Sequence, residues 1–185
     1  IINGESIEKT ADQILASLEH SVNIHPSRIY LVNETASELN LIAESIESSN
    51  SEELLNLLKV DVSKITPSIK NKDSSFLKVI LSGQPLITSD AKEITKIVED
   101  HFNDPAHKKL IPKIYSKLNI KTIGLIPIVS SKKTIGLLAF SSNRLVDEEV
   151  EKRILRISNQ STTAINNALN KKATLEGAKT LNAIN

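Results

Sequence analysis

The sequence predicts an α+β fold, in which a central antiparallel sheet packs against helices. Residues 6–22 carry apolar side chains at helical spacing, and residues 121–129 and 134–141 form two apolar runs with a short polar connection between them. A second helical pattern begins at residue 145 and continues without a proline. Strands joined by a short connection, with helices before and after them, are typical of this fold class.

Length, charge and aromatic content exclude several functions. The 185 residues fit one hydrophobic core, because chains divide into domains reliably only beyond about 250 residues. The 23 basic and 22 acidic residues leave a formal net charge of +1, too small to attract nucleic acid or an anionic membrane surface. Aromatic residues make up only 3% of the chain, so stacking surfaces for single-stranded nucleic acid are missing. We therefore expect no nucleic-acid partner and no direct membrane contact.

Cysteine and methionine are both absent. The lack of cysteine excludes disulfides, cysteine-based metal sites, a cysteine nucleophile and any cofactor attached through a thioether. No run of about 20 apolar residues and no basic-then-apolar leader is present, so we expect a soluble, cytoplasmic domain. A chain that begins at Ile1 and contains no methionine is also expected to be a piece of a longer protein.

The first part of the chain is predicted to run helix, strand, strand, helix. Ser6 is a favourable N-cap for the helix over 6–22. β-Branched residues at 27–33 predict a strand, and residues 39–43 predict its antiparallel neighbour. A loop rich in serine, asparagine and glutamate then leads to a short predicted helix at 54–58.

The middle of the chain is predicted to contain two helices around a short strand. Residues 73–81 form a helix that ends at Gly83, a residue suited to left-handed backbone. A strand follows at 85–89. Asp90, with a glutamate three residues later, has the spacing of a capping box and opens a helix that fades near His101.

The two apolar runs near the end of the chain predict a hairpin through the connection 130–133. Apolar residues occupy both odd and even positions of each strand, so both faces of the sheet are expected to be covered. Gly124 and Gly136 indicate places where another group packs close to the backbone. The helix that begins at residue 145 closes the chain.

Four blocks in this order carry a resemblance to a known family. They are a strand end that reads Gln84-Pro-Leu-Ile-Thr-Ser-Asp90, a hairpin strand with an apolar-Pro-apolar run at Ile123–Val129, a return strand with Ile-Gly-Leu at Thr134–Phe140, and the acidic helix start Asp147-Glu-Glu-Val150. In both order and spacing the chain resembles a GAF domain. The resemblance covers nearly the whole chain.

The resemblance implies a single GAF domain over residues 1–185 in a signal-transduction protein such as a histidine kinase. It divides the chain into an N-terminal helix at 1–24, a sheet core with a pocket at 25–144, and a C-terminal signalling helix at 145–185. The terminal helices cover one face of the sheet, and irregular helices and loops cover the ligand-pocket face. The implied function is a cytoplasmic small-molecule sensor that relays through a homodimer of its terminal helices, within a parent protein that can be a membrane-anchored receptor.

Matching the hairpin to the family's bilin-binding members assigns residues to the pocket. Because side chains alternate between the faces of a strand, alternate hairpin positions and their partners on the first strand share one face. Ser89 and Asp90 end the third strand at the pocket mouth, where capping the next helix explains them equally well. The expected ligand-contacting residues are Tyr30, Val32, Ser89, Asp90, Ile123, Leu125, Pro127, Ala139 and Ser141.

The sequence does not identify the ligand or cofactor. A covalently attached bilin is excluded by the absence of cysteine, so a non-covalent small molecule is expected. His101 and His107, with Asp104 between them, are candidate ligands of haem or a metal, but their spacing fits one helix face poorly and we interpret them as solvated loop histidines. Asn143-Arg144 ahead of Asp147 weakly resembles the cyclic-nucleotide signature of some GAF domains, but the phenylalanine of that signature is missing.

Catalysis finds no support in the sequence, which has neither a glycine-rich phosphate loop nor a G-x-S-x-G motif. Two non-catalytic functions therefore remain. The first is the ligand-binding sensor. The second is a degenerate module that binds no ligand and serves only for dimerisation and relay. The small residues Ser161, Ala164 and Ala168 can form a weak dimer seam, or can belong to a helix that covers its own sheet.

Overall fold

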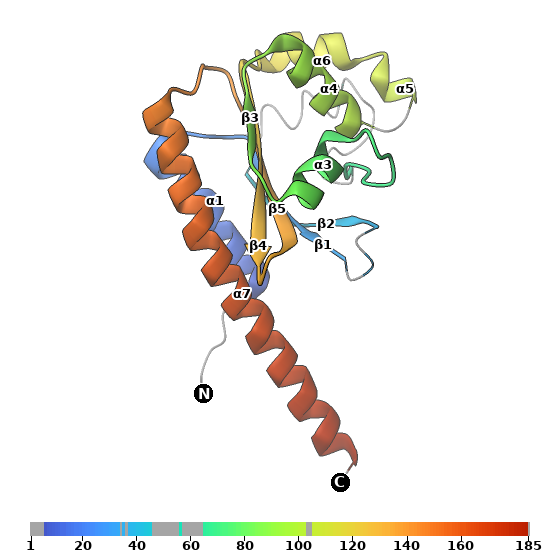
Figure 1. Ribbon diagram of the computed structural model, residues 1–185, viewed down its shortest axis with the longest axis vertical. Coiled ribbons are helices and arrows are strands. Elements are labelled where there is room, and N and C mark those ends of the chain that lie inside the picture. The colour runs from blue at the N-terminus through green and yellow to red at the C-terminus, as the bar shows by residue number, and fades with distance from the viewer. Residues whose placement is uncertain are drawn as a thin grey trace.

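The computed structural model describes residues 6–33, 35, 37–45, 56, 65–102 and 105–184, and it confirms the α+β class. A central sheet separates two layers of helices (Figure 1). In chain order the elements are α1 (Ile7–Val22), β1 (Ser27–Val32), β2 (Leu39–Ser45), α3 (Ser75–Ser82), β3 (Leu86–Thr88), α4 (Ala91–His101), α5 (Pro105–Lys108), α6 (Ile111–Leu118), β4 (Thr122–Ser130), β5 (Lys133–Ser142) and α7 (Glu148–Ile184). Residues 54, 55, 57 and 58 of the predicted helix at 54–58, and also Asp104, lie outside the described residues.

The strands form one antiparallel sheet in the order β2-β1-β5-β4-β3. Its centre is the predicted hairpin of β4 and β5, but the turn is shorter than the predicted four residues. Ser131 and Lys132 alone connect the strands, with φ of 47° and 66°. Positive φ at both central residues is typical of the type I′ turn, whose twist matches that of the flanking strands.

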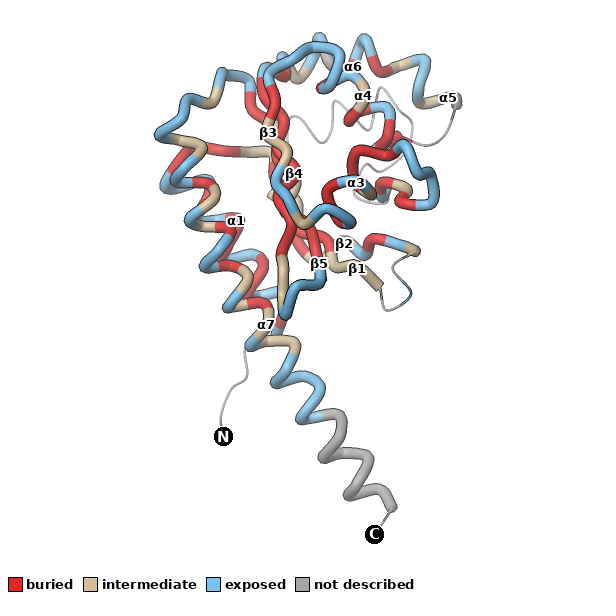
Figure 2. Tube along the Cα trace, in the orientation of Figure 1, coloured by how far each residue is buried: buried red, intermediate tan, exposed pale blue. Residues whose placement is uncertain are grey.

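Each face of the sheet is covered by its own group of helices, as predicted. α1 and α7 pack on one face, where Ile29, Ile126 and Leu138 point toward them. α3, α4 and α6 pack on the other, over Tyr30 and Leu125. Figure 2 shows buried residues along the sheet and on the helix sides that face it. The burial of neighbouring positions on β4 explains why its apolar residues do not alternate with polar ones.

Two glycines of the hairpin allow close packing, as their positions predicted. A Cβ atom at Gly124 would lie 2.0 Å from the ring of Phe140, its cross-strand partner. A Cβ atom at Gly136 would lie 2.5 Å from the backbone oxygen of Tyr30. Within the hairpin, the Phe140 ring therefore covers the β4 backbone at Gly124 on the α1 and α7 side, and β5 packs closely against β1 at Gly136.

Side-chain caps fix the helix starts. The Ser6 hydroxyl accepts a hydrogen bond from the Lys9 backbone amide at the start of α1. The Asp90 carboxylate accepts from the amides of Lys92 and Glu93 at the start of α4, which confirms the predicted N-cap. α7 begins at Glu148 rather than at residue 145, because the Asp147 carboxylate accepts from the Val150 amide and sets the first turn there.

The first half of α7 belongs to the domain and its second half extends beyond it (Figures 1 and 2). Ile154, Ser158, Ser161 and Ile165 are buried on the side of α7 that faces α1 and the sheet. Ser161 is only 3% exposed, so it packs within this chain and is not open to a dimer seam. Residues 171–175 are exposed. In the described part of the chain, no helix has both the length and the hydropathy needed to cross a bilayer.

Candidate functional site

A cavity of about 130 Å³ lies between the sheet and the helices α3, α4 and α6. It is on the face opposite to α1 and α7, where the pocket was predicted. Small side chains on β5 make room for it. Ala139 lies directly between Arg28 on β1 and Leu125 on β4 in the strand register, and the next position on this face is Ser141. The lining residues are Pro26, Ser27, Arg28, Tyr30, Phe76, Ile97, Val98, His101, Phe102, Ile114, Leu118, Ile120, Ile123, Leu125, Ala139, Phe140 and Ser141.

Five of the nine predicted site residues line this cavity, namely Tyr30, Ile123, Leu125, Ala139 and Ser141. The register explains why they come together, because Ile123 is opposite Ser141 and Leu125 is opposite Ala139. Tyr30 lies on the same face of β1 and is fully buried. That these residues contact a ligand stays a prediction.

The other four predicted residues lie elsewhere. Val32 and Pro127 are on the cavity face of their strands, but neither lines the cavity. Ser89 and Asp90 are exposed. The Ser89 hydroxyl lies 3.0 Å from that of Thr122, and the Asp90 carboxylate caps α4, so both have structural partners away from the cavity.

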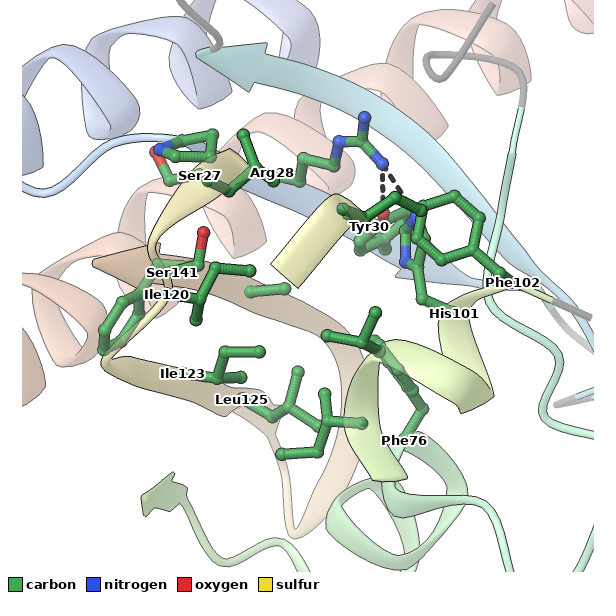
Figure 3. Close-up of a pocket in the computed structure, with 17 residues that line it drawn as sticks. Ser27, Arg28, Tyr30, Phe76, His101, Phe102, Ile120, Ile123, Leu125 and Ser141 are labelled. Atoms are coloured by element: carbon green, nitrogen blue, oxygen red, sulfur yellow. Dashed lines mark hydrogen bonds between the residues drawn. The ribbon is translucent and has the colours of Figure 1, made fainter. Parts of the chain in front are cut away.

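The polar end of the cavity is built by two strands, β1 and β2, and the helix α4. Arg28 Nη1 lies 3.0 Å from Nε2 of His101, the last residue of α4, and 3.5 Å from the hydroxyl of Tyr30. Nη2 of the same guanidinium lies 3.2 Å from a carboxylate oxygen of Glu44, the residue opposite Arg28 on β2. Figure 3 shows Arg28, Tyr30 and His101 at one end, with Ile123, Leu125 and Phe76 below them in the view.

Burial and the arginine keep His101 neutral. Desolvation of the imidazolium, followed by repulsion from the Arg28 guanidinium, lowers the pKa of His101 to about 3 from its ordinary value of 6.5. Desolvation also raises the pKa of Tyr30, although Arg28 opposes the shift. At neutral pH the cavity therefore presents an uncharged imidazole and an uncharged phenol beside an arginine that is already paired with a carboxylate.

The structure corrects the interpretation of His101 as a solvated loop residue. The side chain is partly buried, lines the cavity and packs against Phe76 and Phe102 at ring-centroid distances of 6.1 and 5.0 Å. A signal for this position was present in the sequence. Ile94, Ile97, Val98 and His101 recur at the spacing of one helix face, so the histidine continues the buried side of α4.

Metal and large-cofactor binding do not fit the site. Among the described residues no group of three or more histidines or acidic residues is placed to hold a metal ion. Nε2 of His101 already meets Arg28, and His107 does not line the cavity. Pockets for drug-sized ligands measure roughly 300–1,000 Å³. At about 130 Å³ this cavity is too small as it stands for a tetrapyrrole or a cyclic nucleotide.

Several solved structures share the fold of this chain. One is a domain of a protein described as a two-component sensor histidine kinase from Sinorhizobium meliloti, with 16% identity, a TM-score of 0.59 and coverage of 92% of this chain and 97% of that one. Another, residues 122 to 287 of a methyl-accepting chemotaxis protein, has 13% identity, a TM-score of 0.61 and coverage of 88% and 89%. A GAF domain/HD domain protein from Geobacter sulfurreducens has 13% identity, a TM-score of 0.61 and coverage of 88% and 94%.

At these identities the solved structures establish the fold alone. A comparison with curated protein sequences finds no match. The model of the GAF domain family matches residues 6–165, which include the sheet, the cavity and the helices on both faces. The chain therefore belongs to the GAF domain family, whose members are generally regulatory sensor domains rather than catalytic ones.

Proposed function

We propose that this domain is a non-catalytic, cytoplasmic sensor that binds a small molecule non-covalently and relays its presence through the terminal helices of a homodimer. The observation that carries the proposal is the cavity of about 130 Å³. It lies on the sheet face opposite to α1 and α7, under α3, α4 and α6. An apolar cavity of about 150 Å³ is large enough for benzene or xenon. The size supports a ligand of roughly one ring.

The polar groups of the cavity support binding rather than catalysis. A serine nucleophile needs a base within hydrogen-bond distance. The described part of the chain contains no hydrogen bond between a serine hydroxyl and His101, whose Nε2 is occupied by Arg28. A neutral histidine held in this way can orient a ligand, and it is poorly placed to take a proton from one.

The sheet supplies a physical route between the ligand and the relay. Leu125 lines the cavity, and its neighbour Ile126 packs on the α1 and α7 side of the same strand. On β5, Ala139 lines the cavity, and its neighbour Phe140 packs in the cluster that contains Ile154 of α7. A ligand that shifts the strands by a fraction of an ångström therefore changes the packing under α7, which extends beyond the domain (Figure 1).

Native mass spectrometry of the purified chain separates the sensor from a ligand-free dimerisation module. Ala139→Leu adds three carbon atoms to the floor of the cavity and should abolish ligand retention. Ala91→Leu, the same change at an exposed position that neither lines the cavity nor belongs to α1 or α7, is the matched control. In the wild type and the control we expect a dimer whose mass exceeds that of two chains by the mass of the retained ligand. In Ala139→Leu we expect a dimer with the mass of two chains alone.

Two outcomes would contradict the proposal. Dimers without any retained ligand in all three proteins would favour the alternative, a dimerisation and relay module that binds no ligand. Monomers in all three would contradict the relay through terminal helices. Circular dichroism of Ala139→Leu should show the wild-type helix content, so that loss of ligand is not loss of fold.

A further inference from the structure

The polar end of the cavity contains hydrogen-bond donors that no described residue accepts. A guanidinium can only donate, so Nε2 of His101, 3.0 Å from Arg28 Nη1, accepts that hydrogen bond. The single proton of the neutral imidazole is then on Nδ1. Within the described residues Nδ1 has no hydrogen-bond acceptor.

Tyr30 provides a second donor of the same kind. Its hydroxyl oxygen lies 3.5 Å from Arg28 Nη1, which can only donate to it, and its own proton has no acceptor among the described residues. Tyr30 has no solvent exposure at all. Figure 3 shows the Tyr30 hydroxyl and the His101 ring side by side below Arg28, with the second ring nitrogen of His101 on the side toward the cavity. The Tyr30 hydroxyl is therefore a buried donor without an acceptor, which is unfavourable, and an acceptor on a ligand in the cavity would pair with it and with the Nδ1–H of His101.

Charge favours an uncharged acceptor. The guanidinium of Arg28 is already balanced by the Glu44 carboxylate at 3.2 Å, and the imidazole and phenol carry no charge at neutral pH. The remaining walls are mostly aliphatic and aromatic, including Phe76, Ile123 and Leu125. A carboxylate placed here would lose its hydration without gaining an unpaired cation.

We propose that the cavity binds an uncharged, apolar molecule of about one ring that presents a carbonyl oxygen to the Nδ1–H of His101 and the hydroxyl of Tyr30. This inference rests on the proposed sensor function and adds the chemical class of its ligand. The apolar body fills the space between α4, α6 and the hairpin. The carbonyl selects against hydrocarbons of the same shape, because only an acceptor can pair with the Nδ1–H of His101 and the buried hydroxyl of Tyr30.

Two probes of the same shape test the carbonyl. Cyclohexanone carries the oxygen, and methylenecyclohexane has a CH₂ group in its place. Both are titrated into the full chain by NMR, with the wild type, His101→Phe and the control His20→Phe, which makes the same change on the exposed side of α1. His101→Phe should weaken cyclohexanone binding about fivefold and leave methylenecyclohexane binding unchanged, because it removes a donor and keeps a ring. His20→Phe should change neither.

A second variant tests the other donor, and a third probe tests whether the ligand is uncharged. Tyr30→Phe, which removes only the hydroxyl, should weaken cyclohexanone selectively in the same way. Equal weakening of both probes by His101→Phe and Tyr30→Phe would overturn carbonyl recognition and leave the cavity a ligand site. Tighter binding of cyclohexanecarboxylate than of cyclohexanone would overturn the uncharged class. No saturable binding of any probe would overturn both this inference and the sensor proposal.

Discussion

His101 shows how the surroundings of a single residue decide its chemistry. By residue type a histidine can ligate a metal, transfer a proton or sit in solvent. Here its place on the buried side of α4, next to the Arg28 guanidinium, lowers its pKa to about 3 and leaves it neutral at physiological pH. The same surroundings make folding stability depend on pH.

The pH dependence has a definite sign. In the unfolded chain His101 binds a proton below pH about 6.5, whereas in the folded chain it does so only near pH 3. Acidification through this range therefore favours the unfolded state. We expect the free energy of unfolding to fall between pH 7 and pH 5 by about 1–2 kcal/mol more in the wild type than in His101→Phe.

Urea denaturation at the two pH values measures this difference. The other three histidines are the same in both proteins, so their contributions cancel. An equal loss of stability in the two proteins would mean that His101 titrates normally and is not held neutral by burial and by Arg28.

The pocket face was predictable residue by residue, but the polar end was not. Period-two alternation assigned Ile123, Leu125 and Ala139 to one face, because strand geometry is local. Arg28 and His101 are 73 residues apart, and no sequence pattern pairs them. Ser89 and Asp90 have the types and position of ligand contacts, yet local hydrogen bonding is sufficient to explain them.

At the scale of elements, the hairpin of β4 and β5 connects the two layers of the domain. Its two faces contribute to both hydrophobic clusters, and Phe140 covers the backbone at Gly124. The α4 helix connects the sheet edge to the cavity in a similar way, since Asp90 caps its start and His101 ends it. Each of these roles predicts a change in stability.

Gly124→Ala should destabilise the domain by about 1–3 kcal/mol, because the added methyl group would overlap the Phe140 ring. Chemical denaturation measures the loss. Phe140→Leu removes the overlapping ring atoms. In the Phe140→Leu background, Gly124→Ala should therefore lower the free energy of unfolding by less than it does in the wild type. Strict additivity of the two substitutions would contradict the contact.

Asp90→Ala should lower the free energy of unfolding by about 1 kcal/mol, because two amides at the start of α4 lose their acceptor. Asp73→Ala is the matched control, since Asp73 is exposed and its carboxylate accepts no hydrogen bond from the described residues. Equal midpoints in urea for the two variants would show that the Asp90 cap does not stabilise the helix.

At the scale of the whole molecule, the sheet lies between a cavity layer and a terminal-helix layer. The order of the strands, the terminal helices and both layers could be predicted, because apolar periodicity, caps and the order of the four motif blocks depend on local sequence, whereas α5 and α6 were not predicted. The partner of α7 was harder to predict. Ser161 and Ala168 resemble a dimer seam in sequence, but they pack against the helix and sheet of their own chain.

Ending the chain after residue 170 tests where the proposed dimer forms. Leu169 is the last residue of α7 in the described core and residues 171–175 are exposed, so the shortened chain keeps the described core. We expect the shortened chain to sediment as a monomer, with a midpoint of thermal unfolding at high dilution close to that of the full chain. A dimer of unchanged affinity would place the dimer contact elsewhere on the domain.

The central claim is that the sheet face under α4 and α6 contains a cavity that small molecules enter. Methyl-detected NMR under xenon pressure tests it most directly, because xenon enters apolar cavities without needing a hydrogen bond. The account predicts saturable shifts of the Ile123 and Leu125 methyl groups that Ala139→Leu abolishes. Shifts confined to Ile126 and Ile128 on the opposite face, or no saturable shift at all, would contradict it.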